Sequence, residues 1–506
     1  MIDGGSFVLR TFWVGLIACL MLAAAPLARA APVADARVAF VLSPEFGPEG
    51  LSALKVEVRF AGDASGQTRF AWLKSWAGDE QLYSRARDLK VIGGEARPDG
   101  PGAWIIRAAP RAPIVVSYRV LSAYDHDPIV GDSAQSKPVI RPLWFFATGE
   151  GLFARPEGRD KAPASFAWTG APRGFVFASD LEHLGALGGK AARAGVVDDV
   201  LESISIGGRD VNLTQRRIDG AAVRVATVGR YSFDAKTFTD QVFEVLAAER
   251  AFWGEPAKPF LVAMSPIAAV PHKYSLSGAG RGDGFALWVD DTNAKLADLR
   301  WLLAHEYFHT WNPGLLGGTG AEEVEASEYW FSEGFTDYYA QKLMWTSHQF
   351  SAGEFAAKWN EVLRAYAASP VRAAPNSRIA AEFWSSQAVQ KLPYQRGAML
   401  AALLDRQARA RGSSLDAVMR EMLRRAARPG PKPHADELLP VVYREVTGLD
   451  AGALIARHMI AGEPIDLPAD AFGPCFRVET GEAPTKTGVI TRQQLAPVEG
   501  QAGCGP

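Results

Sequence analysis

Residues 305–309 of this chain read His-Glu-Tyr-Phe-His, and no other feature limits its possible folds as strongly. On a helix, His305 and His309 lie one turn apart on the same face, so both imidazoles can bind one metal ion. Glu306 is offset from the two histidines and can hold a water molecule bound to that metal, where a hydrolytic base must sit. The pattern therefore predicts a helix that carries a metal centre.

A catalytic zinc site uses three protein ligands and one open position, so the two histidines need a third partner. In the metzincin pattern a glycine and then a histidine follow, but Asn312 and Leu315 stand at those positions. The other option is a glutamate on a second helix, and Glu333 fits it within an aromatic, helix-compatible run at 329–339. Asp337 follows one turn later and can accept the free ring N–H of a ligating histidine. The sequence thus predicts one Zn²⁺ per chain.

A buried pair of structural histidines is the alternative explanation for His305 and His309. Histidine is rare in this chain, with 8 residues in 506, so a chance match to the five-residue pattern is uncommon. Glu333 and Asp337 are an independent requirement of the metal-binding interpretation, and both are present. The metal site is therefore favoured over the structural pair.

Two longer segments, His-Glu-Tyr-Phe-His-Thr-Trp-Asn at 305–312 and Trp-Phe-Ser-Glu-Gly-Phe-Thr-Asp-Tyr-Tyr at 330–339, resemble the M61 family of metallopeptidases. This is the glycyl aminopeptidase-like family of the gluzincin clan. A third segment, Leu-Pro-Tyr-Gln-Arg-Gly at 392–397, is similar to the tyrosine segment that related aminopeptidases carry after their zinc helices. The resemblance implies that Tyr394 donates a hydrogen bond to the oxyanion of the tetrahedral intermediate. An ordinary packed tyrosine is the alternative.

One segment departs from the family pattern. Members of the family resemble each other in a Gly-Gly-Leu-Glu-His-like stretch on the strand ahead of the zinc helix, whereas residues 282–287 here read Gly-Asp-Gly-Phe-Ala-Leu. In related aminopeptidases an acidic residue on that strand holds the amino terminus of the substrate. Asp283, in a glycine-rich loop, is the nearest substitute, and Phe285 should lie on the strand at the cleft rim. Both are candidate substrate-binding residues.

The resemblance implies a zinc-dependent metallopeptidase of aminopeptidase type with a peptide as its substrate. Because the usual acidic residue is absent, an endopeptidase without a free-amine requirement is an alternative. A catalytically silent peptide-binding scaffold is a second alternative, although all ligands and the base are present. Nucleic acid is not an expected partner, since 54 Lys and Arg residues balance 56 Asp and Glu residues without a basic stripe. The oligomeric state stays open.

The N-terminus predicts export from the cytoplasm. Arg10 precedes an apolar stretch at 11–26, and Ala-Arg-Ala at 28–30 is a small-x-small cleavage site, so residues 1–30 read as a signal peptide. A membrane anchor is the alternative, but the stretch is short for a spanning helix. Lipidation at Cys19 is another, although apolar residues continue beyond it. We therefore expect a periplasmic or secreted protein.

The mature chain is expected to have no stable membrane span, because no later stretch is long and apolar enough. After cleavage only Cys475 and Cys504 remain. Two cysteines in an exported chain can form a disulfide, which here would fix the C-terminal tail.

Length and periodicity predict an α+β protein of more than one domain. Short β-rich runs predict a β-sandwich-like N-terminal domain at 31–225, and helical spacing predicts a mainly helical domain at 226–465. The resemblance implies that this second domain is a thermolysin-like catalytic domain. Helices are expected at 398–411, 414–426, 434–447 and 451–460, loops at 278–284 and through the tail at 466–506. M61 proteins often continue into a PDZ domain, but the remaining residues are too few for one.

Overall fold

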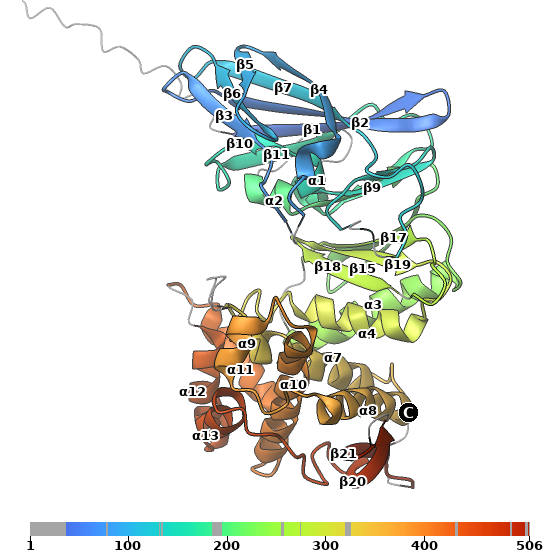
Figure 1. Ribbon diagram of the computed structural model, residues 1–506, viewed down its shortest axis with the longest axis vertical. Helices are drawn as coiled ribbons and strands as arrows, with labels where there is room; N and C mark the ends of the chain where they lie inside the picture. Colours follow the sequence, from blue (N-terminus) through green and yellow to red (C-terminus); the bar gives the residue numbers. More distant parts are fainter. Residues whose placement is uncertain are drawn as a thin grey trace, which may run out of the picture.

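The computed structural model describes residues 37–506, except for 77–78, 131, 133–134, 185–194, 255–257, 274, 319–324, 431–433, 486–487, 501–503 and 505–506. The expected signal peptide, 1–30, and Cys19 lie outside the described residues. In Figure 1 a β-rich part, a further sheet and a helical part follow one another along the longest axis. This order confirms the predicted α+β fold.

The N-terminal part is built from two sheets that enclose one hydrophobic core. The first has the strand order β13-β11-β1-β2-β7-β4 and the second β10-β3-β6-β5. Buried and less buried residues alternate along the strands, as in β7, because one face of each strand points into the core. The strands are β1 (Val38–Gly47), β2 (Gly50–Ala61), β3 (Gln67–Ala71), β4 (Ala86–Ile92), β5 (Glu95–Pro98), β6 (Ala103–Arg107), β7 (Pro113–Val120), β10 (Arg155–Pro156), β11 (Pro163–Trp168) and β13 (Gly195–Val196).

Two more sheets connect this part to the helices. One has the order β12-β14-β9-β8, and the other has the order β15-β16-β17-β19-β18. Phe146 of the first sheet packs edge-on against Trp288 of the second, with ring centroids 5.4 Å apart. The strands are β8 (Val139–Ile140), β9 (Trp144–Thr148), β12 (Val176–Ser179), β14 (Ile204–Gly208), β15 (Asn212–Ile218), β16 (Ala221–Thr227), β17 (Phe260–Ile267), β18 (Leu276–Arg281) and β19 (Gly284–Asp290). The expected domain boundary between 225 and 226 therefore falls inside β16.

The helical part begins with two helices that cover the five-stranded sheet. They are α3 (Ala235–Trp253) and α4 (Leu296–Phe308), and the following helices are α6 (Tyr329–Ser332), α7 (Gly334–Thr346), α8 (Ala352–Ala368), α9 (Asn376–Glu382), α10 (Gln387–Arg409), α11 (Leu415–Ala426), α12 (Ala435–Thr447) and α13 (Gly452–Leu454), which continues as a π-helix at Ile455–Ile460. The N-terminal part adds α1 (Gly149–Leu152), α2 (Val197–Leu201) and the 3₁₀ turns Leu82–Arg85 and Asp180–Leu184. None of the helices among the described residues has both the length and the hydrophobicity that a membrane span needs.

The start of α10 differs from the prediction. The sequence predicts a helix from residue 398, whereas the helix begins at Gln387, with Ser386 as its N-cap and Pro393 in its interior. Proline lacks the backbone N–H of a helix interior, which explains why the pattern places the start too late. The consequence is that Tyr394 lies on a helix and not in the loop before one.

The glycine-rich stretch at 278–284 is not a loop, so that prediction is wrong. Its residues form β18 and the start of β19, which pair antiparallel around a two-residue turn at Gly282 and Asp283. A Cβ atom on Gly278 would lie 2.2 Å from Cζ of Phe285. Glycine therefore makes room for an aromatic ring on the neighbouring strand.

The C-terminal tail is also regular, contrary to the loop-like prediction for 466–506. It contains a hairpin of β20 (Phe476–Thr485) and β21 (Gly488–Pro497), which pairs over its full length. The Asn360 side chain on α8 exchanges two hydrogen bonds with the backbone of Leu495, at 2.9 and 2.7 Å. A disulfide joins Cys475 to Cys504, as the sequence predicts.

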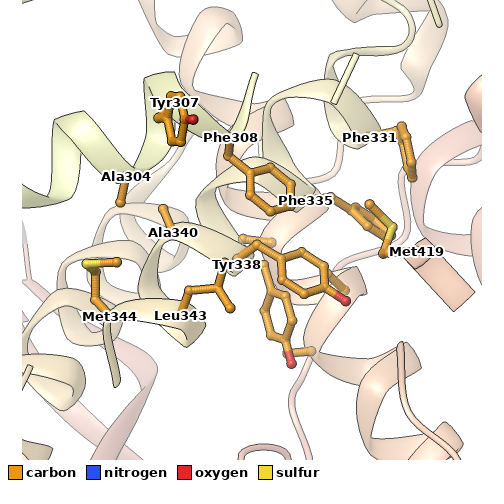
Figure 2. Close-up of a cluster of buried hydrophobic side chains, with 14 of the residues drawn as sticks. Ala304, Tyr307, Phe308, Phe331, Phe335, Tyr338, Ala340, Leu343, Met344 and Met419 are labelled. Atoms are coloured by element: carbon orange, nitrogen blue, oxygen red, sulfur yellow. The ribbon is translucent and has the colours of Figure 1, made fainter. Parts of the chain in front are cut away.

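A large hydrophobic cluster joins α4 to α7, as Figure 2 shows. Phe308 on α4 and Tyr339 on α7 stack with ring centroids 5.1 Å apart and planes 9° apart. Phe308 and Phe335 are fully buried, and each such side chain stabilises the fold by roughly 1.5–3 kcal/mol. The cluster thus fixes the two helices whose ends carry the predicted metal ligands.

Candidate metal centre and active site

Three predicted ligand atoms meet where α4 ends and α7 begins. His305 lies in the last turn of α4, His309 directly follows the helix with helical backbone angles, and Glu333 lies between α6 and α7. The Nε2 atoms of His305 and His309 are 3.1 Å apart. Oε2 of Glu333 is 3.2 Å from Nε2 of His305 and 3.4 Å from Nε2 of His309. The three atoms form a compact, nearly equilateral triangle.

The triangle fits a tetrahedral zinc ion. Zinc binds imidazole nitrogen and carboxylate oxygen at about 2.0–2.2 Å, which places neighbouring ligand atoms of a tetrahedron about 3.3 Å apart. The three observed separations lie close to that value. Two histidines and one glutamate also leave a fourth position open, as a catalytic site requires.

The outward-facing nitrogen of each histidine has an acceptor. Nδ1 of His305 lies 2.8 Å from Oδ1 of Asp337, and Nδ1 of His309 lies 2.8 Å from the backbone oxygen of Asn312. With the proton on Nδ1, each imidazole presents the lone pair of Nε2 to the metal. Asp337 and Asn312 therefore set the tautomer and the orientation of the two rings.

The side chain of Asn312 is hydrogen-bonded to residues of α6 and α7. It is fully buried, and its Nδ2 donates to the backbone oxygen of Phe331 at 3.1 Å and to Oγ1 of Thr336 at 3.3 Å. The peptide bond from Asn312 to Pro313 is cis. One residue thus links the end of α4 to the segment that carries Glu333.

The electrostatics of the centre favour a cation. Burial lowers the pKa of His305, but hydrogen bonds to Asp337 and Glu333 and their charges raise it well above its usual value. The pKa of His309 is also raised, because Glu333 outweighs the effect of burial. Burial would raise the pKa of Glu333, yet the two histidines hold it well below its usual range. Positive charge at this point is stabilised, as a site for a divalent metal demands.

Glu306, the predicted base, is half-buried and borders a cavity of about 880 Å³. His309 borders the same cavity, so this space leads to the metal centre. The cavity also extends to Asp283 at the turn between β18 and β19, and to Trp76 of the N-terminal part. A substrate in this cavity therefore lies within reach of the base.

Tyr394 lies on the other side of the ligand set, on α10. Its ring is 6.1 Å from that of His305, with the two planes 20° apart, and its hydroxyl is hydrogen-bonded to Glu333. Burial, followed by the charges of Glu333 and Asp337, raises the pKa of Tyr394 well above its usual value. The phenol therefore keeps its proton and remains a hydrogen-bond donor beside the metal centre.

The position of Tyr394 depends on a close crossing of helices. A Cβ atom on Gly334, the residue after Glu333, would lie 2.5 Å from the Cα of Gly397. A Cβ atom on Gly397 would lie 1.9 Å from the backbone oxygen of Trp330. Only glycine fits at both positions, and this brings α10 close enough for Tyr394 to reach the ligands.

The two candidate substrate-binding residues have different surroundings. Asp283 is half-buried at the hairpin turn, borders the cavity of Glu306, and accepts a backbone hydrogen bond from Leu261 with its main-chain oxygen. Phe285 is only 1% exposed and belongs to the core. Every residue of β19 is buried, because one face of the strand packs against side chains of α3 and α4 and the other against the sheet that contains β9 and β14. The prediction that Phe285 lies at the cleft rim is therefore wrong.

Sequence reasoning missed two contributors to the site. Asn312 excludes the metzincin pattern and ends the segment 305–312, but the sequence assigns it no structural role; its place three residues after His309 is the signal of a helix-end anchor. The contact between Gly334 and Gly397 joins residues that are far apart in the chain. Its only sequence signal is a glycine directly after Glu333 and another three residues after Tyr394.

Comparisons with known proteins agree with this site. Residues 298–397 match the model of the family described as M61 glycyl aminopeptidase. No curated protein gives a sequence match. An aminopeptidase N family protein from Idiomarina loihiensis is similar in structure, with 16% identity, coverage of 88% of this chain and 79% of that chain, and a TM-score of 0.68. An M1 zinc metallopeptidase from Deinococcus radiodurans has 14% identity, coverage of 85% and 95%, and a TM-score of 0.48.

The similarity to the Idiomarina protein shows a shared fold. The family match is more specific, because it covers the residues of the candidate site. The matched segment contains both histidines, Glu306, Glu333 and Tyr394. Together with the ligand triangle, the match supports a zinc peptidase whose residues 298–397 are similar to the M61 glycyl aminopeptidase family.

Proposed function

We propose that this protein hydrolyses peptide bonds at a single zinc ion bound by His305, His309 and Glu333. The observation that carries this proposal is the triangle of ligand atoms, whose separations suit zinc. The acceptors behind both imidazoles support it, because a metal site needs its ligands in fixed orientations. A silent binding scaffold would not need a carboxylate base beside the ligands and open to a cavity.

Each part of the reaction has a residue. Zinc, when bound, supplies Lewis acidity that lowers the pKa of a coordinated water. Glu306 accepts the proton of the attacking water and later gives it to the leaving amine. Tyr394 donates a hydrogen bond to the oxygen of the scissile carbonyl, where negative charge develops in the transition state. Burial raises the pKa of Tyr394, which favours the protonated form of this donor.

We also propose that the substrate presents a free amino terminus, with Asp283 as its partner. A buried ammonium without a carboxylate is costly, and Asp283 borders the cavity that contains Glu306 and His309. The endopeptidase alternative rests on β19, because Phe285 and the two residues after it provide no acidic side chain and the side chain of Phe285 is buried in the core. Comparing free with N-acetylated peptides separates the two.

Two substitutions test the proposed chemistry. Glu306→Gln should keep about one zinc per chain and lower kcat by several orders of magnitude, because only the proton acceptor is removed. Glu333→Ala should instead lose the zinc. Metal content by mass spectrometry and hydrolysis of a general peptide substrate provide the readouts. Near-normal turnover of Glu306→Gln would show that another group is the base.

Export of the protein is a further proposal. It is supported by the signal-like sequence at 1–30 and by the disulfide between Cys475 and Cys504, a bond typical of oxidising compartments. The mature N-terminus should be Ala31. Intact-mass measurement with and without reductant tests both points, and a lipid on Cys19 would contradict the signal-peptide interpretation.

A further inference from the structure

A second cavity borders the metal centre on the side of Tyr394. Its volume is about 290 Å³, and it is lined by Tyr329, Glu333, Phe383, Trp384, Gln390, Lys391 and Tyr394. Glu333 and Tyr394 are the ligand and the oxyanion donor of the proposed reaction. A peptide whose scissile carbonyl accepts a hydrogen bond from Tyr394 therefore places a neighbouring side chain close to this cavity.

Three aromatic residues form an apolar wall of the cavity. Phe383 is nearly buried and makes edge-on contacts with Tyr329, at 4.7 Å between ring centroids, and with Trp384, at 5.0 Å. The backbone of this wall is fixed, since Phe383 and Ser385 donate to the main-chain oxygens of Ile379 and Glu382. The wall is therefore a preformed surface.

Trp384 is exposed to an unusual degree. Its exposed fraction is 71%, the highest among the exposed large hydrophobic side chains of the described residues, whereas Trp330 and Trp359 are nearly or fully buried. An exposed indole lacks the stabilisation that burial of apolar surface gives. Covering this surface with an apolar group of the substrate would recover that free energy in the bound state.

The polar side of the cavity disfavours basic ligands. Lys391 is exposed, lies one helical turn before Tyr394, and makes no ion pair with any residue that the structure describes. Residues three apart on a helix face the same side, so the ammonium group lies on the cavity face of α10. Lys391 would repel a second cation in the cavity, while the carboxylate of Glu333, the other charged group in the lining, faces His305 and His309.

We propose that this cavity is a specificity pocket for a large apolar or aromatic side chain next to the scissile bond of a peptide, and that Trp384 is its main determinant. The inference rests on the proposed peptidase function and names its substrate class. Its volume suits one aromatic side chain, and Lys391 disfavours lysine and arginine. Peptides with phenylalanine at this position should therefore be preferred over those with alanine or lysine.

The test uses two peptide series. Phenylalanine, alanine or lysine is placed before the scissile bond in one series and after it in the other, with the products identified by mass spectrometry. In the wild-type protein kcat/KM should favour phenylalanine over alanine by about tenfold or more in one series, which identifies the side of the bond that the pocket serves. Trp384→Ala should reduce that ratio to about threefold or less, and Trp384→Phe should restore most of it.

Controls separate this inference from the proposed function. Ile92→Ala removes a similarly exposed apolar side chain on the distant strand β4 and should leave the ratio unchanged. Binding of the same peptides to Glu306→Gln, with and without Trp384→Ala, measures selectivity by calorimetry without turnover. An unchanged phenylalanine-to-alanine ratio in both measurements would overturn the pocket while the peptidase stands. A wild-type protein that binds selectively but hydrolyses no peptide would overturn the peptidase and leave the pocket.

Discussion

Gly334 and Gly397 touch through their backbones, and this contact places the oxyanion donor beside the metal ligands. Each glycine lies within three residues of a proposed functional side chain, Glu333 or Tyr394. A Cβ atom on either one would overlap backbone atoms of the facing helix. The geometry of the site is thus set partly by the absence of two side chains.

We expect Gly397→Ala to reduce both stability and activity. The added methyl group would lie 1.9 Å from the backbone oxygen of Trp330, so α10 must move away from α6. Overpacking of this kind costs about 1–3 kcal/mol of unfolding free energy. Denaturant unfolding and kcat measure the two effects. Gly481→Ala, where the new Cβ meets no atom within 4 Å, is the matched control, and equal behaviour of the two variants would contradict the prediction.

Asp337→Asn should weaken zinc binding without removing a ligand. The carboxylate of Asp337 faces Nδ1 of His305 at 2.8 Å, and loss of such a partner typically lowers metal affinity 10–100-fold. Competition with a chelator of known affinity measures the change. The Asn312→Ala variant should weaken binding too, because its amide anchors the segment whose oxygen faces His309. Wild-type affinity in Asp337→Asn would show that the ligands are oriented by other contacts.

Glu249→Gln should make the stability less sensitive to pH. Glu249 on α3 is fully buried with no hydrogen-bond partner on either oxygen among the described residues, and burial raises its pKa well above the usual value. The folded state therefore keeps a proton that the unfolded chain releases above about pH 4.3. The stabilising effect is complete below that pH and is lost as the pH rises towards the folded pKa.

Urea unfolding at pH 5 and pH 8 tests this linkage. The unfolding free energy of the wild-type protein should fall more between the two pH values than that of Glu249→Gln. Glu244→Gln, on the exposed face of the same helix, should behave like the wild-type protein. Parallel pH profiles for all three proteins would show that Glu249 does not bind the proton.

Asp283→Asn should affect only substrates with a free amino terminus. If Asp283 holds the substrate ammonium, the substitution raises KM for free-amine peptides and leaves N-acetylated peptides unaffected. In the wild-type protein kcat/KM should favour the free amine by more than about tenfold, which corresponds to 1.4 kcal/mol. A smaller preference would favour the endopeptidase alternative.

The sequence predicts the parts of the site that depend on local geometry. His305, Glu306 and His309 are one turn of helix, and Glu333 and Asp337 are another, so spacing alone places them on common faces. The contact from Asn312 to Phe331 and the crossing at Gly397 depend on how the helices pack, which the chain order does not reveal. The exposure of Phe285 likewise depends on packing, because the helices that cover this face of β19 bury its side chain.

The hairpins show a second limit of sequence patterns. Residues 278–284 and the tail after 475 are rich in glycine or polar residues, and such stretches usually form loops. Pairing with a neighbouring strand overrides that tendency where an aromatic ring fills the space above Gly278 or where Phe476 packs on Phe355 of α8. These partners are distant in sequence.

The five-stranded sheet has consequences for how the molecule can be divided. One face packs on the β-rich part through Trp288 and Phe146, and the other supports α3 and α4. A chain that began at residue 226 would lose β15 and most of β16 and would leave Trp288 uncovered. The two halves should therefore unfold in one cooperative step, and limited proteolysis should not release an active helical fragment.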